Sequence, residues 1–135
     1  MNELVKLRTE GRIGVIEIDS PPVNALSQTV REGITQSLQS AIEDDAVEAI
    51  VLICSGRTFI AGADIREFGL PPKKPHLPEV VAALEASPKM VVAAIHGTAL
   101  GGGFEIALCA WNALWNRFAA NGSNKNRSVT SAAFP

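Results

Sequence analysis

The sequence of 135 residues has few of the features that mark metal, redox or nucleotide-binding proteins. It has only two cysteines, Cys54 and Cys109, without CxxC spacing, and each lies in an apolar stretch. We therefore expect two buried free thiols, which indicate a reducing compartment, with the cytoplasm as the default. The sequence has no cluster of metal-ligating residues, no Gly-x-x-x-x-Gly-Lys loop and no Gly-x-Gly-x-x-Gly fingerprint.

Charge and hydropathy exclude further classes. The formal net charge at pH 7 is −2, which gives no reason to expect nucleic acid as a partner. No apolar run is long enough to span a bilayer, and the first residues resemble neither a secretory signal nor a transit peptide. Neither Ser27 nor Ser55 has the Gly-x-Ser-x-Gly context of a serine hydrolase. We expect no membrane partner.

Residues 1–110 carry the alternation of strand and helix patterns that is typical of an α/β protein. Ser27 fits an N-cap and precedes four apolar residues spaced by four, which predicts an amphipathic helix ending at residues 43–45. Four prolines between residues 71 and 78 predict a linker. The predicted order is strands at 3–9 and 12–19 joined by a turn at Glu10-Gly11, the helix after Ser27, a strand at 48–54 buried on both faces, a short helix at 65–68, a helix at 80–86, a strand at 90–95 and a helix that begins at glycines 101–103.

The segment Ala94-Ile-His-Gly-Thr-Ala-Leu-Gly-Gly-Gly-Phe-Glu-Ile-Ala-Leu-Cys109 carries the strongest functional signal. Three consecutive glycines cost helix stability, but at the start of a helix they leave backbone N–H groups open to a negatively charged oxygen. Glu105 follows Gly102 by three residues, so both lie on the same helix face. This spacing places an oxyanion donor beside a carboxylate that can move protons, which suits chemistry through an enolate.

A second strand leads into a similar loop. Val51–Cys54 is apolar, and the loop Ala61-Gly-Ala-Asp64 can present another free N–H before the short helix at residues 65–68. These two junctions, preceded by Pro-Pro-Val-Asn-Ala-Leu at residues 21–26, resemble the crotonase (enoyl-CoA hydratase/isomerase) superfamily. The residues at 21–26 are especially similar to the hydratase domain of multifunctional β-oxidation enzymes. The resemblance implies a crotonase-like α/β fold of ββα-type repeats.

The resemblance also implies site residues. The oxyanion donors are the backbone N–H groups of Ala63 and Gly102, and Glu105 transfers protons. The glycines alone also fit a tight, closely packed turn, and Glu105 also fits a solvated glutamate favoured by the helix dipole. The residues implied to line the CoA site are Ala25, Leu26, Ala61, Asp64, Ile65 and Arg66.

Two of the candidate residues have structural interpretations beside the functional ones. Asp64 also fits a helix N-cap, and we expect it to serve that role as well. His96 follows a buried strand and has no carboxylate at orienting spacing, so we interpret it as a structural histidine in the turn rather than as a general base.

The composition changes after residue 110. Residues 111–135 hold both tryptophans, five of the seven asparagines and no acidic residue. The resemblance covers residues 3–110, about half of such a domain, and no match to the family's second catalytic glutamate is found. We therefore predict that 1–110 is the N-terminal portion of a crotonase-like domain, truncated after the Gly-Gly-Gly-x-Glu helix. Residues 111–135 are predicted to be an atypical Asn-rich tail, disordered or out of frame.

The implied activity is that of an enoyl-CoA hydratase in fatty-acid β-oxidation, which adds water reversibly to a 2-enoyl-CoA thioester through a stabilised enolate. The alternatives are a Δ3–Δ2 enoyl-CoA isomerase, a non-catalytic acyl-CoA-binding module and an inactive fragment. No cofactor is implied, because CoA is part of the substrate. The partner is the acyl-CoA itself, and full-length members of the family are expected to form homo-trimers or hexamers.

Overall fold

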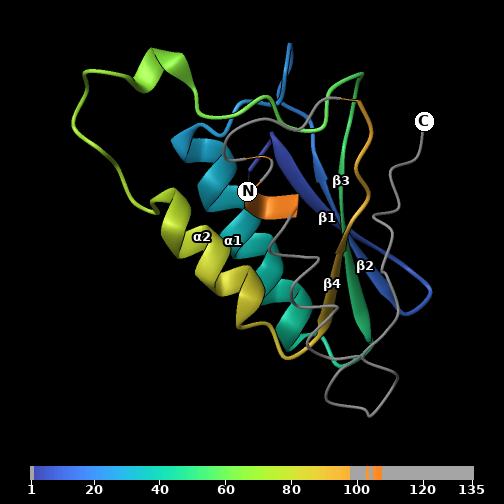
Figure 1. Ribbon diagram of the computed structural model, residues 1–135. Coiled ribbons are helices and arrows are strands. Elements are labelled where there is room, and N and C mark those ends of the chain that lie inside the picture. Colours follow the sequence, from blue (N-terminus) through green and yellow to red (C-terminus); the bar gives the residue numbers. More distant parts are fainter. Residues whose placement is uncertain (1, 98–102, 104, 108–135) are drawn as a thin grey trace, which may run out of the picture.

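The computed structural model describes residues 2–97, 103 and 105–107, and these residues form a mixed sheet with helices on one face (Figure 1). The four strands lie in the order β1-β2-β3-β4. β1 (Val5–Glu10) is antiparallel to β2 (Ile13–Ile18), whereas β3 (Ala49–Cys54) is parallel to β2, and β4 (Met90–Ala93) is parallel to β3. The predicted α/β class is confirmed.

The β1–β2 hairpin closes at the predicted turn. Gly11 has φ +59°, a left-handed conformation that glycine adopts without strain. Pairing runs from Val5 opposite Ile18 to Glu10 opposite Ile13. Ile16 and Ile18 are fully buried, whereas most of β1 beyond Val5 is exposed, because β1 is the edge strand of the described sheet.

Helix α1 (Gln28–Glu43) covers the sheet as predicted, and α2 (Leu77–Glu85) packs beside it (Figure 1). The Ser27 side chain accepts a hydrogen bond from the Val30 N–H at 3.3 Å, which confirms the N-cap. The buried face of α1 consists of Val30, Gly33, Ile34, Leu38 and Ala41. Ile42, the last residue of the predicted apolar series, is only partly buried because a helical period of 3.6 moves Ala41 into the core instead.

Several predicted boundaries are wrong by one to three residues; β1, for example, begins at Val5 rather than at residue 3. α2 begins at Leu77, not residue 80, and Pro78 lies in its first turn, where a missing N–H costs no helical hydrogen bond. β4 ends at Ala93 rather than at residue 95, although the Ala94 N–H still donates to the Leu52 carbonyl at 2.9 Å.

β3 is buried on one face and half-buried on the other. Ile50, Leu52 and Cys54 alternate with partly exposed residues, so the expectation that both faces are buried is wrong for the described residues. Burial raises the pKa of the Cys54 thiol to about 12, as expected for a buried free cysteine. Cys109 lies outside the described residues. Among the described residues, no helix is both long and apolar enough to cross a membrane.

Candidate functional site

The two segments that carry the predicted site leave the carboxyl ends of parallel, adjacent strands. β3 leads into residues 55–64, and β4 leads into the segment that contains Gly103 and Glu105. Loops that follow neighbouring parallel strands emerge at the same edge of a sheet, where ligands bind in many α/β proteins. The predicted site residues therefore come from segments that leave the sheet at one edge (Figure 1).

Hydrogen bonds and one close backbone approach join the segments that follow β3 and β4. The Phe59 N–H donates to the His96 carbonyl at 3.1 Å, and the His96 Nε2 lies 2.6 Å from the Gly56 carbonyl oxygen. Gly97 has φ +62°, and a Cβ at this position would lie 2.0 Å from the Arg57 carbonyl oxygen. The ring contact of His96 agrees with its interpretation as a structural histidine in the turn.

A second close approach lies nearer the predicted chemistry. Gly103 is buried, and a Cβ on it would lie 2.5 Å from the Ile60 carbonyl oxygen. Ile60 directly precedes Ala61, so the two predicted oxyanion segments meet through this contact. The missing side chain of Gly103 is what permits the approach. Gly102, the predicted donor, lies outside the described residues.

The loop that carries Ala63 is held by the segment at residues 21–26. The Leu26 N–H donates to the Gly62 carbonyl at 2.8 Å, and Leu26 forms an isolated parallel bridge with Ala63. The Ala61 N–H donates to the Val23 carbonyl at 3.1 Å. Ala63 itself is exposed, and within the described residues its N–H donates to no other group. The structure thus places, at an exposed position of a fixed loop, a backbone donor that has no partner among the described residues.

Asn24 positions this segment, a role that the sequence analysis missed. Its backbone has φ +52°, and its side chain is buried. The Asn24 Nδ2 donates to the carbonyls of Ser55 and Thr58, both at 2.8 Å, while its Oδ1 accepts from the Ser20 N–H at 2.8 Å. Asparagine after two prolines is a turn signal, because it tolerates positive φ and bonds to nearby backbone. That signal could have identified Asn24.

Asp64 has the N-cap role that was expected. It precedes the 3₁₀ helix η1 (Ile65–Glu67), and its Oδ1 accepts from the Arg66 N–H at 3.0 Å. The Arg66 guanidinium also donates to both carboxylate oxygens, with Nη2 2.7 Å from Oδ2. These side-chain hydrogen bonds hold the pKa of the Asp64 carboxyl below its ordinary value.

The charge on Asp64 is expected to make stability depend on pH. Because its pKa is lower in the folded state, the carboxylate stabilises the fold above the unfolded pKa of about 4, and this contribution is lost as the pH falls through the folded pKa. We expect Asp64→Asn to lower the free energy of unfolding by at most about 1 kcal/mol at neutral pH, since Arg66 is largely exposed. Urea unfolding measures the difference in free energy of unfolding between the unaltered chain and Asp64→Asn, which should be smaller at about pH 2.5 than at about pH 7. A difference that is the same at both pH values would contradict the assignment.

The remaining site residues differ in exposure. Ile65 is 75% exposed, and Phe68 and Leu70, which follow it, are 69% and 61% exposed. These apolar side chains lie on solvent in the segment that follows Ala63, as expected where an apolar ligand is to be bound. Glu105 is helical and exposed, while its neighbour Ile106 is fully buried in the core. The helix therefore turns its carboxylate outward and anchors itself with Ile106.

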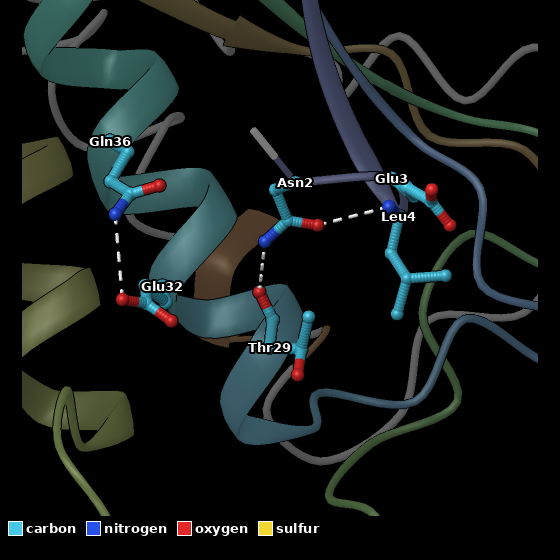
Figure 2. Close-up of a pocket in the computed structure, with 6 residues that line it drawn as sticks. All are labelled: Asn2, Glu3, Leu4, Thr29, Glu32 and Gln36. Atoms are coloured by element: carbon cyan, nitrogen blue, oxygen red, sulfur yellow. Dashed lines mark hydrogen bonds between the residues drawn. The ribbon is translucent and has the colours of Figure 1, made fainter.

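A pocket elsewhere in the molecule does not involve the predicted residues. It has a volume of about 410 Å³ and lies between the start of β1 and helix α1 (Figure 2). Its lining residues are Asn2, Glu3, Leu4, Thr29, Glu32 and Gln36. The Asn2 side chain is already bonded to the chain, with Nδ2 2.6 Å from the Thr29 carbonyl oxygen and Oδ1 accepting from the Leu4 N–H at 2.9 Å. We therefore do not assign the site to this pocket.

Metal binding is not supported by side-chain groupings. In the part of the chain that the structure describes, no group of three or more His, Cys, Asp or Glu residues could hold a metal ion. The described residues of the site supply backbone donors, exposed apolar side chains and the carboxylates of Asp64 and Glu105.

Comparisons with known proteins place this geometry in context. A family model described as Enoyl-CoA hydratase/isomerase matches residues 8–127. The peroxisomal bifunctional enzyme of Danio rerio is 48% identical over 96 residues, which cover 71% of this chain and 13% of that protein. A probable enoyl-CoA hydratase of Bacillus subtilis is 37% identical over 113 residues, which cover 77% of this chain and 43% of that protein.

Solved structures share the fold. The structure of Pseudomonas aeruginosa DspI is similar with a TM-score of 0.72 and 30% sequence identity, covering 79% of this chain and 47% of that one. An enoyl-CoA hydratase/isomerase family member is similar with a TM-score of 0.71 and 29% identity, covering 78% of this chain and 44% of that one. The chain thus spans less than half the length of each of these relatives.

Proposed function

Because the chain belongs to the enoyl-CoA hydratase/isomerase family, we propose that its site serves the hydration of a 2-enoyl-CoA thioester in fatty-acid β-oxidation. The observation that carries the proposal is the N–H of the exposed residue Ala63, which has no partner within the described part of the chain and lies on a loop that contacts Gly103 through Ile60. A backbone donor held in this way is already oriented before substrate binds, as stabilisation of a developing oxyanion requires.

The proposed reaction places each group at a defined step. Water adds its oxygen to the β-carbon of the double bond, and the electron pair of that bond moves onto the thioester oxygen to give an enolate. The N–H groups of Ala63 and Gly102 donate to this oxygen, and the loss of one such donor costs roughly 3–4 kcal/mol in comparable enzymes. Glu105 takes a proton from the water as its oxygen bonds to the β-carbon, and the protonated Glu105 then delivers that proton to the α-carbon as the enolate collapses, so that the carboxylate is regenerated.

The CoA portion is proposed to lie along two paired segments. Ala25 and Leu26 lie beside Ala61 and Asp64, because Leu26 pairs with the loop through the Gly62 carbonyl and the Ala63 bridge. Ile65 and Arg66 follow, both exposed. No separate cofactor enters the proposal, since CoA is part of the substrate.

The hydration of crotonyl-CoA tests the role of Glu105. We expect the purified chain to turn over slowly, below about 1 per second, because no second catalytic glutamate is matched in the sequence. Glu105→Ala should lower the measured rate at least ~100-fold, the usual contribution of a positioned acid–base group. The measurement is loss of enoyl-thioester absorbance. Turnover that survives Glu105→Ala unchanged would contradict the assignment.

Two further measurements separate the alternatives. Titration calorimetry with butyryl-CoA, with free CoA as the control, measures whether the chain binds an acyl-CoA. Binding without turnover would identify a binding module, whereas the absence of binding would identify an inactive fragment. A 3-enoyl-CoA supplied as substrate asks for isomerase activity, since a shift of the double bond into conjugation raises the enoyl-thioester absorbance.

The cellular compartment and the oligomeric state are also proposals. We propose the cytoplasm, because the buried thiol of Cys54 fits a reducing compartment. Several relatives carry names that place those proteins in peroxisomes. A homo-trimer or hexamer is proposed for the assembly by analogy with the family, and sedimentation of the purified chain measures it.

A further inference from the structure

Arg31, on the first turns of α1, makes more hydrogen bonds to distant segments than its place on a surface helix requires. Its side chain is only 12% exposed. Its Nε donates to the Pro75 carbonyl at 2.7 Å, and its Nη1 donates to the Leu26 carbonyl at 2.7 Å. Its Nη2 donates to the Lys73 carbonyl at 3.2 Å. One guanidinium thus connects α1 to the segment at 21–26 and to the proline-rich linker.

Glu67 completes this connection from η1. Its Oε1 lies 3.3 Å from both Nη1 and Nη2 of Arg31, and its Oε2 accepts from the Gln28 N–H at 2.8 Å. Gln28 is the first residue of α1, whose N–H has no partner within the helix. The carboxylate therefore satisfies a helix-end donor and an arginine together, and the positive end of the helix dipole favours its charge.

These contacts matter because the segment around η1 has little else to hold it. η1 has three residues and none is buried, and the nearby apolar side chains of Ile65, Phe68 and Leu70 are on solvent. Hydrophobic burial therefore does not fix this segment. The Gln28 side chain adds one further bond, from Nε2 to the Lys74 carbonyl at 2.9 Å. Polar contacts from the first turn of α1 are what position it.

We propose that Arg31 and Glu67 are positioning residues for the oxyanion site: together they clamp the segment after Ala63 onto the start of α1 and so keep the Ala63 N–H aimed at the thioester oxygen. This inference rests on the proposed function for its ligand. Ala63 is held on its other side by Leu26, whose own carbonyl accepts from Arg31. The clamp therefore reaches both supports of the Ala63 loop.

Arginine is required for this role, and lysine is not a substitute. The guanidinium presents five N–H donors in a planar fork, and here they reach four acceptors on three segments. A lysine ammonium has three donors at one point and cannot span the same carbonyls. Arg31→Lys should therefore behave almost like Arg31→Met, although it keeps the charge.

A chromophoric substrate analogue tests the clamp without turnover. The CoA thioester of para-dimethylamino-cinnamic acid absorbs at longer wavelength when donors polarise its carbonyl, so it reports on the Ala63 N–H. We expect the unaltered chain to give a red shift, and Arg31→Met and Glu67→Gln to reduce it and to weaken binding by about tenfold. Arg12→Met is the matched control, because Arg12 forms an exposed ion pair with Glu48.

Amide hydrogen exchange on the free protein tests the clamp independently of any ligand. In Arg31→Met, the amides of residues 64–75 should exchange about tenfold faster, whereas those of β2 and β3 should not change. Absence of a red shift in the unaltered chain would overturn the proposed function and this inference with it. A red shift that both variants retain in full, or exchange that Arg31→Met leaves unchanged, would overturn the inference alone.

Discussion

Gly97→Ala is expected to lower the free energy of unfolding by about 3–5 kcal/mol, the sum of backbone strain and overpacking. Gly97 has φ +62°, and its new Cβ would lie 2.0 Å from the Arg57 carbonyl oxygen and 3.1 Å from the carbonyl carbon. Both atoms are backbone, so no side-chain rotation relieves the clash. The neighbouring bond from the Phe59 N–H to the His96 carbonyl also resists separation of the two strand exits.

Gly56→Ala is the matched control for this prediction. Gly56 has φ +84°, and a Cβ there would meet no atom within 4 Å, so only the strain of positive φ remains. We expect it to cost about 1 kcal/mol. Urea unfolding followed by circular dichroism measures both variants. Equal losses for Gly97→Ala and Gly56→Ala would show that the close approach to Arg57 contributes nothing.

Local signals account for the parts of the fold that the sequence predicts. The Ser27 cap, the Glu10-Gly11 turn and the Asp64 cap each depend on a few neighbouring residues, and all three are confirmed. The start of α2 was missed because the four prolines at residues 71–78 were interpreted as a linker, although Pro78 is acceptable in the first turn of a helix. The half-buried face of β3 was missed because an apolar run does not say how many layers cover it.

The turn signal at residues 21–24 could have identified Asn24, but the partners of the residues that support the site could not be predicted, because these contacts connect residues far apart in sequence. Arg31 and Glu67 are 36 positions apart, and Asn24 reaches residues 31 and 34 positions away. An arginine on an amphipathic helix is normally solvated, so its type and spacing carried no signal. The roles of Ala63, Gly102 and Glu105 stay predictions that the experiments above address.

Gly103→Ala is expected to have the second-largest effect and to separate packing from helix propensity. In an open helix, alanine is favoured over glycine by about 1 kcal/mol, so the substitution would stabilise the protein if the position had room. A Cβ on Gly103, however, would lie 2.5 Å from the Ile60 carbonyl oxygen and 2.6 Å from the Ile60 Cβ. We expect a net loss of about 2–3 kcal/mol in the free energy of unfolding.

The same substitution should also remove the red shift of the chromophoric thioester, because the glycine segment must move away from the loop that carries Ala63. The shift is measured at low temperature, where circular dichroism shows that the variant is folded. Adding Ile60→Ala should not restore stability, since the Ile60 carbonyl and Cβ remain in place. Glu105→Ala, on the same helix but exposed, is the stability control and should change the free energy of unfolding by less than about 0.5 kcal/mol. A Gly103→Ala variant that is more stable and keeps the red shift would mean that the two loops do not depend on this contact.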